Sequence, residues 1–136
     1  MTDAIDLVRS TWAKVATDPE AASALFYATL FKLAPETEQL FKSDLEAQGA
    51  KLTETLAFVV DHLDDPDTLL PAARDLAIRH TTYGVAAGDY DSVGTALLQT
   101  LESALGTGFA AAEKSAWADT YQGLADYMIT QAYPKV

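Results

Sequence analysis

The apolar residues of this chain recur at helical spacing along its whole length, and this spacing limits the folds that are open to it. Ile5, Val8 and Trp12 lie on one face of a helix near the amino terminus, and the same interval of three or four residues returns in each later segment. No stretch alternates apolar and polar residues as a half-buried strand does. We therefore predict an all-α chain of about seven helices with short connections.

Proline and capping residues predict where the first helices begin and end. Asp18-Pro19 reads as an N-cap followed by a proline in the first turn, so a second helix begins here. Ala34-Pro35 ends that helix and starts a short one that reaches about Phe41. Ser43-Asp44-Leu45-Glu46 has the pattern of a capping box and opens a long helix.

Turn residues place the later helices. Asp64-Asp65-Pro66-Asp67 predicts a turn, and the helix after it has Pro71 near its start and ends at His80. Gly84 is the residue at which the chain leaves this helix, because glycine adopts a left-handed conformation at little cost. Asp91 or Ser92 caps the next helix, which ends at Gly106. The last helix begins near Phe109 and ends before Pro134.

The composition is that of one soluble globular domain without thiol chemistry. A length of 136 residues is enough for one hydrophobic core, and we expect a single domain at residues 1–136. The net charge of −11 argues against a nucleic acid or an anionic membrane as partner. The lack of cysteine excludes disulfides and covalent haem attachment, and it is compatible with the cytoplasm. We expect no secretion signal, membrane span or additional domain.

His80 closes an apolar helical face. Ala77, Leu76 and Ala73 precede it by one turn and two turns, so the imidazole stands at the end of their stripe. An imidazole in this position suits the axial coordination of a haem iron. A capping histidine that interacts with the helix C-terminus is the alternative reading. The other histidine, His62, is surrounded by aspartates and reads as a solvated surface residue.

Several fragments, in order and at their spacing, resemble the bacterial single-domain globins, which are related to the haem domain of flavohaemoglobins and more distantly to neuroglobin. The resemblance covers essentially the whole chain and implies a globin fold, with helices in a three-over-three sandwich around haem b. The fragments that carry it are Leu30-Phe31-Lys32-Leu33-Ala34-Pro35-Glu36, Leu40-Phe41, Gln48-Gly49-Ala50-Lys51-Leu52, Arg79-His80, Tyr83-Gly84-Val85, Tyr90-Asp91-Ser92-Val93-Gly94 and Ala116-Trp117.

The resemblance implies that His80 is the proximal iron ligand. Lys51 is expected to point outward, and the two readings are a lysine that pairs with a haem propionate and a plain solvated lysine. Tyr90 matches a tyrosine that, in flavohaemoglobins, joins a glutamate to make the proximal histidine more electron-donating. That glutamate is replaced by Ala132 here, and neither Asp119 nor Asp126 has the helical phase to substitute for it. The residues expected to contact the porphyrin are Phe41, Leu52, Leu76, Tyr83, Val85, Val93 and Leu97.

The distal side is expected to carry Tyr27 and Gln48, with Leu52 above the iron. By themselves these residues read as a core aromatic and a polar residue near a helix start. The resemblance instead implies that Tyr27, with Gln48, donates hydrogen bonds to dioxygen. Gly49 matches a small residue that lets its helix cross the second helix closely, with Ser23 or Ala24 facing it.

These residues predict a b-type haem protein that binds dioxygen reversibly and with high affinity. Carbon monoxide and nitric oxide are further expected ligands. The alternatives are a nitric oxide dioxygenase served by a separate reductase and, ranked last, a gas-sensing globin. We expect a monomer or weak dimer that binds neither nucleic acid nor membranes.

Overall fold

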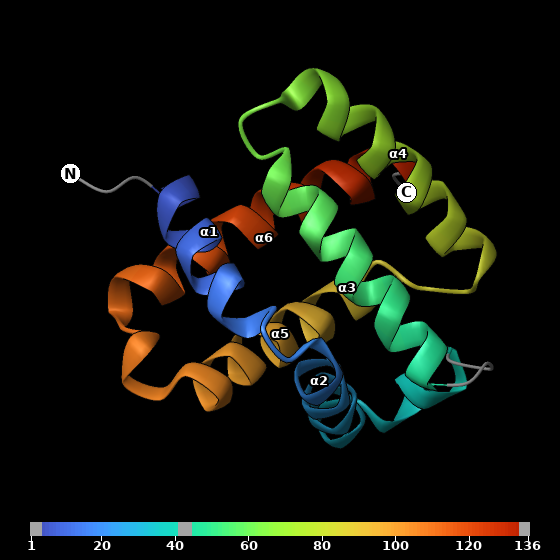
Figure 1. Cartoon of the computed structure of the whole chain (residues 1–136). Coiled ribbons are helices and arrows are strands. Elements are labelled where there is room, and N and C mark those ends of the chain that lie inside the picture. Colours follow the sequence, from blue (N-terminus) through green and yellow to red (C-terminus); the bar gives the residue numbers. More distant parts are fainter. Residues whose placement is uncertain (1–3, 41–44, 134–136) are drawn as a thin grey trace.

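The computed structural model describes residues 4–40 and 45–133, and these are almost entirely helical (Figure 1). The described residues contain no strand, which confirms the all-α prediction. None of their helices is both long enough and apolar enough to cross a bilayer. The elements are α1 (Ala4–Val15), α2 (Pro19–Leu33), η1 (Pro35–Leu40), α3 (Leu45–Asp61), α4 (Pro66–Thr82), α5 (Asp89–Leu105), η2 (Gly106–Gly108) and α6 (Ala111–Ala132).

Several boundaries lie where the sequence predicts them. The Asp18 carboxylate accepts a hydrogen bond from the backbone N–H of Ala21 at 3.3 Å, and Pro19 occupies the first turn of α2. Gly84 ends α4 with φ +92°, and Gly106 ends α5 with φ +55°. Both values lie in the region that favours glycine. The capping box at residues 43–46 falls partly outside the described residues.

Three boundaries differ from the prediction. Helix α4 begins at Pro66, so Pro71 lies inside it and the preceding turn is shorter than expected. A proline in the first turn costs no helical hydrogen bond, which explains why Pro66 starts the helix. Helix α5 begins at Asp89 rather than behind Asp91 or Ser92, and the Asp89 carboxylate accepts from the Ala86 N–H at 2.9 Å. The last helix begins at Ala111, so Phe109 precedes it.

Helix α4 follows α3 after a short turn and lies next to it (Figure 1), but its main packing partner is α6. Helix α2 contacts both α3 and α5, whereas α4 packs against α6. Helix α1 is joined to α6 by a buried hydrogen bond from the Trp117 indole N–H to the hydroxyl of Thr11. The long α6 therefore contacts α1 through its first turns and α4 through its later turns.

The buried apolar residues form two clusters rather than one. The first cluster is built mainly from α1, α2, α3 and α5 and has Leu30 and Leu101 at its centre. The second joins α4, the start of α5 and the second half of α6, around Ala77 and Tyr90. Tyr121 packs against both clusters. Tyr27 and Leu52, predicted for the distal side, belong to the first cluster, and Leu76 and Val85, predicted for the proximal side, belong to the second. Val93 and Leu97, also predicted for the proximal side, belong to the first cluster.

Candidate functional site

His80 lies near the end of α4 with one ring nitrogen committed to the backbone. Its Nδ1 is 2.8 Å from the carbonyl oxygen of Leu76, one turn earlier. A carbonyl oxygen can only accept, so the proton of the neutral imidazole is on Nδ1. The lone pair is then on Nε2, the nitrogen available to a metal. A hydrogen bond of this kind orients the ring and supports its role as a ligand.

The surroundings of His80 favour the neutral, metal-binding form. Burial lowers the pKa of His80 below its ordinary value, and the nearby charge of Arg79 lowers it further. The hydrogen bond to the Leu76 carbonyl acts in the opposite direction but is the smaller effect. The imidazole therefore stays unprotonated to a more acidic pH than an exposed histidine does.

His62 makes the same kind of backbone hydrogen bond in a different environment. Its Nδ1 is 2.8 Å from the carbonyl oxygen of Phe58, and its ring stacks on that of Phe58 with centroids 4.3 Å apart. Phe58 is itself 36% exposed. His62 is partly exposed, in keeping with the prediction of a surface residue, although its ring is covered on one side by Phe58. His80 instead lies with its ring centroid 6.0 Å from that of the buried Tyr90. Surroundings, not the backbone hydrogen bond, distinguish the two histidines.

The turn after α4 completes one wall around His80. The N–H of Val85 donates to the carbonyl oxygen of His80 at 3.0 Å, so the chain folds back directly behind the histidine. Val85 and Leu76 both pack in the second cluster, as expected for residues of the proximal wall. Tyr83 is 62% exposed and would contact a ligand of this site only at its edge.

Tyr90 is held in place by a hydrogen bond from Tyr121 to its backbone carbonyl. The ring of Tyr121 lies over Gly94, where a Cβ atom would come within 2.6 Å of it, and its hydroxyl donates to the Tyr90 carbonyl at 2.7 Å. The Tyr90 side chain is only 6% exposed, and its hydroxyl has no hydrogen-bond partner in the described residues. Burial, and then the nearby hydroxyl of Tyr133, raise the pKa of Tyr90.

No carboxylate reaches Tyr90 within the described part of the chain. Asp119 and Asp126 are both exposed, and Asp126 accepts a hydrogen bond from Gln122 at 2.8 Å. Ala132 packs in the same cluster as Tyr90, where it contributes only a methyl group. The lack of a glutamate partner for Tyr90 stays a prediction. The hydrogen-bond partner of His80 is accordingly a neutral carbonyl.

On the opposite side, Tyr27 is buried in α2 between two aromatic rings. Its ring centroid lies 5.3 Å from that of Phe26 and 5.9 Å from that of Phe31, and the residue is 5% exposed. Burial raises the pKa of Tyr27 to about 12, so its hydroxyl keeps its proton at neutral pH. A buried phenol of this kind is a stable hydrogen-bond donor.

Helix α3 crosses α2 closely at Gly49, which brings the neighbourhood of Gln48 to Tyr27. A Cβ atom on Gly49 would lie 2.7 Å from the Ser23 Oγ and 3.8 Å from a ring carbon of Tyr27. The expected close approach of Gly49 to Ser23 is therefore confirmed. Gln48 is half-buried beside this crossing.

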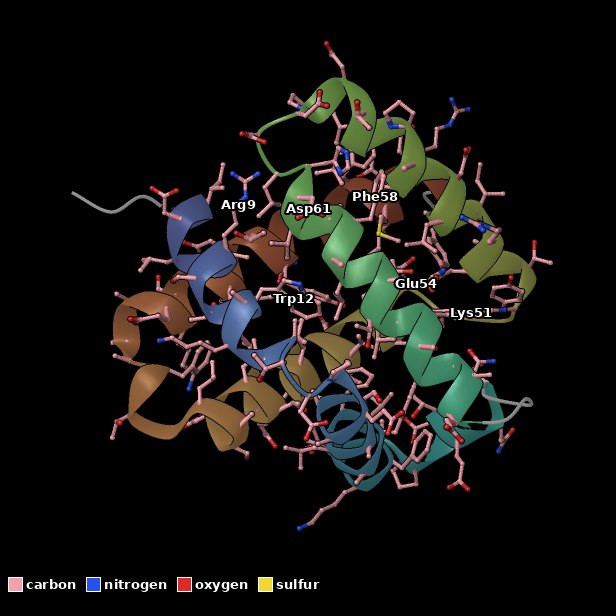
Figure 2. The ribbon with its side chains drawn as sticks, in the orientation of Figure 1. Arg9, Trp12, Lys51, Glu54, Phe58 and Asp61 are labelled. Atoms are coloured by element: carbon pink, nitrogen blue, oxygen red, sulfur yellow. The ribbon has the colours of Figure 1, made fainter. Side chains whose placement is uncertain are left out.

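The other residues predicted to contact the porphyrin are divided between the two clusters. Leu52, Val93 and Leu97 belong to the first cluster with Tyr27, whereas Leu76 and Val85 belong to the second. Lys51 is exposed on α3 (Figure 2). Phe41 lies outside the described residues.

A cavity of about 290 Å³ lies between α3, α4 and α6. Its lining includes Leu76 from α4 and Met128 from α6. Glu54 and Phe58 border it from α3, and Figure 2 shows both on the side of α3 that faces α4. Neither this cavity nor the contacts of Tyr121 and Tyr133 could be predicted from the sequence, because each depends on residues that are far apart in the chain.

Comparisons with known proteins agree with this arrangement. The globin family model matches residues 24–128. The flavohemoproteins of Bordetella parapertussis and Chromobacterium violaceum are 33% and 32% identical over 90% of this chain, which spans 31% of their length. A carbene transferase engineered from RmaNOD, a candidate nitric oxide dioxygenase of Rhodothermus marinus, superposes with a TM-score of 0.83. That match is 30% identical and covers 94% of this chain and 89% of the other. The chain therefore belongs to the globin family.

Proposed function

We propose that this globin binds haem b through His80 and uses it to bind dioxygen reversibly. The observation that carries the proposal is the setting of His80, which is half-buried near the end of α4 with its Nδ1 bonded to the Leu76 carbonyl, so that Nε2 is left for a metal. Tyr27, which we assign to the distal side, is buried among the aromatic rings of α2. The residues present fit a haem, because His80 offers Nε2 and the flanking side chains are largely apolar.

The residues that would hold the haem come from both clusters. His80 would bind the iron, with Leu76 and Val85 against one porphyrin face. Val93 and Leu97 would add to that wall from α5, Leu52 would lie over the opposite face, and Phe41 and Tyr83 would complete the pocket. Lys51 would pair with a propionate. The haem, when bound, supplies an iron that binds diatomic gases. Attachment is non-covalent, because the sequence has no cysteine.

Tyr27 and Gln48 would hold dioxygen in the distal pocket. The Tyr27 hydroxyl retains its proton and can donate to the partly negative oxygen of the ligand. Hydrogen bonds to charged acceptors contribute about 1.5–3 kcal/mol, which is roughly a tenfold to hundredfold gain in retention. Gln48 cannot titrate, so acid does not disable it by protonation.

A nitric oxide dioxygenase that works with a separate reductase is the second candidate. The names of the relatives, flavohemoproteins and a candidate nitric oxide dioxygenase, favour it. The neutral surroundings of His80 favour simple binding, because a carbonyl makes the imidazole less electron-donating than a carboxylate does. Turnover of nitric oxide with a supplied reductase separates the two, since a simple binder stops after one equivalent.

The first test is the absorption spectrum of the purified protein as isolated, reduced, and reduced with carbon monoxide. A Soret band that shifts at each step supports the proposal. No Soret band after addition of hemin would contradict it. A cytoplasmic location, a monomeric or weakly dimeric state, and carbon monoxide and nitric oxide as further ligands complete the proposal.

The variant Tyr27→Phe tests the distal assignment. We expect dioxygen to dissociate roughly tenfold to hundredfold faster, because one strong hydrogen bond is lost. Carbon monoxide dissociation should change much less, since this ligand is less polarised when bound. Laser photolysis and stopped-flow mixing measure both rates. Tyr127→Phe removes a hydroxyl from α6 and serves as the control. Equal dioxygen rates in Tyr27→Phe and wild type would refute the assignment.

A further inference from the structure

Tyr133, directly after the end of α6, contacts two different parts of the His80 side of the molecule. Its hydroxyl donates a hydrogen bond to the carbonyl oxygen of Val85 at 2.7 Å. Its ring meets that of Tyr90 edge-on, with centroids 5.8 Å apart and planes at 90°. One side chain thereby joins the end of α6 to the turn after α4 and to the start of α5.

Each contact leads to His80 in one further step. The N–H of Val85 donates to the His80 carbonyl at 3.0 Å, and the Tyr90 ring lies 6.0 Å from the imidazole. The chain leaves α4 at Gly84 with φ +92°, and the bond from Val85 to His80 closes the turn on the end of the helix. Tyr133 adds a contact to this turn from another element.

The Tyr90 hydroxyl adds a second reason to look at Tyr133. No well-formed hydrogen bond to this buried hydroxyl is present in the described residues, which is unusual for a native protein. Burial, and then the interaction with the Tyr133 hydroxyl, raise the pKa of Tyr90. The Tyr133 oxygen donates its own proton to Val85 and keeps lone pairs that can accept another. A small shift of Tyr90 would therefore create a relay from Tyr90 through Tyr133 to the Val85 carbonyl. All members of this relay are uncharged.

We propose that Tyr133 is a positioning residue for the proximal histidine. It holds the Val85 turn and the Tyr90 ring, and through them it sets the orientation of His80 toward the iron. It occupies this role without a carboxylate, since Ala132 beside it provides none. The inference rests on the proposed function, because the orientation of His80 has a consequence only when haem is bound.

Two variants of Tyr133 in the haem-loaded protein separate positioning from general packing. Tyr133→Phe keeps the edge-on ring and removes only the hydrogen bond to Val85, whereas Tyr133→Leu removes both contacts. Tyr127→Phe is the matched control, because it makes the same change on α6 in the same cluster. The measurements are the iron–histidine stretching band of the ferrous protein by resonance Raman, haem transfer to an acceptor globin, and thermal unfolding of the haem-free chain.

We expect Tyr133→Phe to broaden the iron–histidine band and to lose haem about threefold to tenfold faster, as for one neutral hydrogen bond. Tyr133→Leu should show a larger change, and Tyr127→Phe should match wild type. The inference is overturned if Tyr133→Phe retains the wild-type band and haem-loss rate, even with a lower unfolding temperature. In that case Tyr133 only stabilises the fold. A wild-type protein that takes up no haem would instead refute the proposed function itself.

Discussion

At the scale of single residues, His80 and His62 show how little the identity of a residue decides. Both donate from Nδ1 to a carbonyl four residues earlier at 2.8 Å. Only His80 lies next to a buried ring, that of Tyr90 in the second cluster. Burial lowers the pKa of His80. His80 is therefore the histidine that we propose as the metal ligand.

The lowered pKa of His80 predicts a pH dependence for the haem-free protein. The unfolded chain takes up a proton near the ordinary value of 6.5, while the folded chain takes it up only at lower pH. The unfolded state then binds more protons as the pH falls through that window, so the free energy of unfolding decreases. We expect His80→Gln to flatten this decline between about pH 7 and pH 5.

Urea unfolding at several pH values measures the effect. The same variant should fail to retain haem, because the axial nitrogen is gone. A His80→Gln protein with the wild-type slope against pH would show that burial of the imidazole is not the cause. A variant that retained the wild-type ferrous spectrum would refute His80 as the ligand.

At the scale of the elements, the crossing of α2 and α3 depends on Gly49. The hypothetical Cβ contact with Ser23 is closer than real Cβ atoms allow, and it involves the Ser23 Cβ at 3.0 Å as well as its hydroxyl. Gly123 on α6 is the opposite case, because nothing lies within 4 Å of its hypothetical Cβ. The two glycines lie in helix interiors and differ in what faces them.

We predict opposite effects for the two glycine-to-alanine substitutions. Gly49→Ala should lower the free energy of unfolding by about 1–2 kcal/mol, since overpacking costs more than the gain in helix propensity. Gly123→Ala should raise it by about 0.5–1 kcal/mol through propensity alone. Denaturant unfolding of both variants measures the difference.

A second substitution tests the cause. Ser23→Gly removes the side chain that Gly49→Ala would meet, so the double variant should recover part of the loss. The appropriate comparison is with Ser23→Gly alone, because that change lowers the helix propensity of α2 by itself. An additive double variant would show that the helices are not in contact at this point.

At the scale of the whole molecule, α6 brings the two clusters into one structure. Its Trp117 is bonded to Thr11 of α1, and its Tyr121 touches both clusters and binds the backbone of Tyr90. The end of this helix then lies beside the turn that follows His80, through Tyr133. The chemistry proposed for His80 consequently depends on residues near the carboxyl end of the chain.

Adding a carboxylate at this end should change the haem. Ala132→Glu places a negative charge in the cluster that contains Tyr90, where a negative charge stabilises the oxidised iron. We expect the reduction potential to fall by about 50–100 mV, the effect of one charge at intermediate distance and dielectric. Spectroelectrochemical titration measures it.

Ala132→Gln has nearly the same shape without the charge and is the control for this prediction. Its potential should stay close to that of wild type. Equal shifts in both variants would indicate that repacking, not charge, is responsible. If Ala132→Glu also raised nitric oxide turnover with a supplied reductase, the missing carboxylate would explain why simple binding is favoured in the native chain.

Most helix boundaries were predictable because their signals are local. Asp18 and Pro19 start α2, and Gly84 and Gly106 end α4 and α5, each through the conformation of a few neighbouring residues. The start of α4 was predicted near Pro71, but the helix begins at Pro66, because a proline is accommodated in the first turn of a helix. The approach of Gly49 to Ser23 was predicted only with the help of the family resemblance.

The sequence by itself determined the helices, the lack of thiol chemistry and His80 as a candidate ligand, whereas Tyr27 and Gln48 became candidates only through the family resemblance. Caps, helical spacing and composition are properties of neighbouring residues, so no tertiary contact is needed to read them. Only the tertiary structure decided the surroundings of each histidine, the unpartnered hydroxyl of Tyr90 and the place of Tyr133. Burial and contact between α4, α5 and α6 arise when distant segments pack together, and the order of residues along one helix does not contain them.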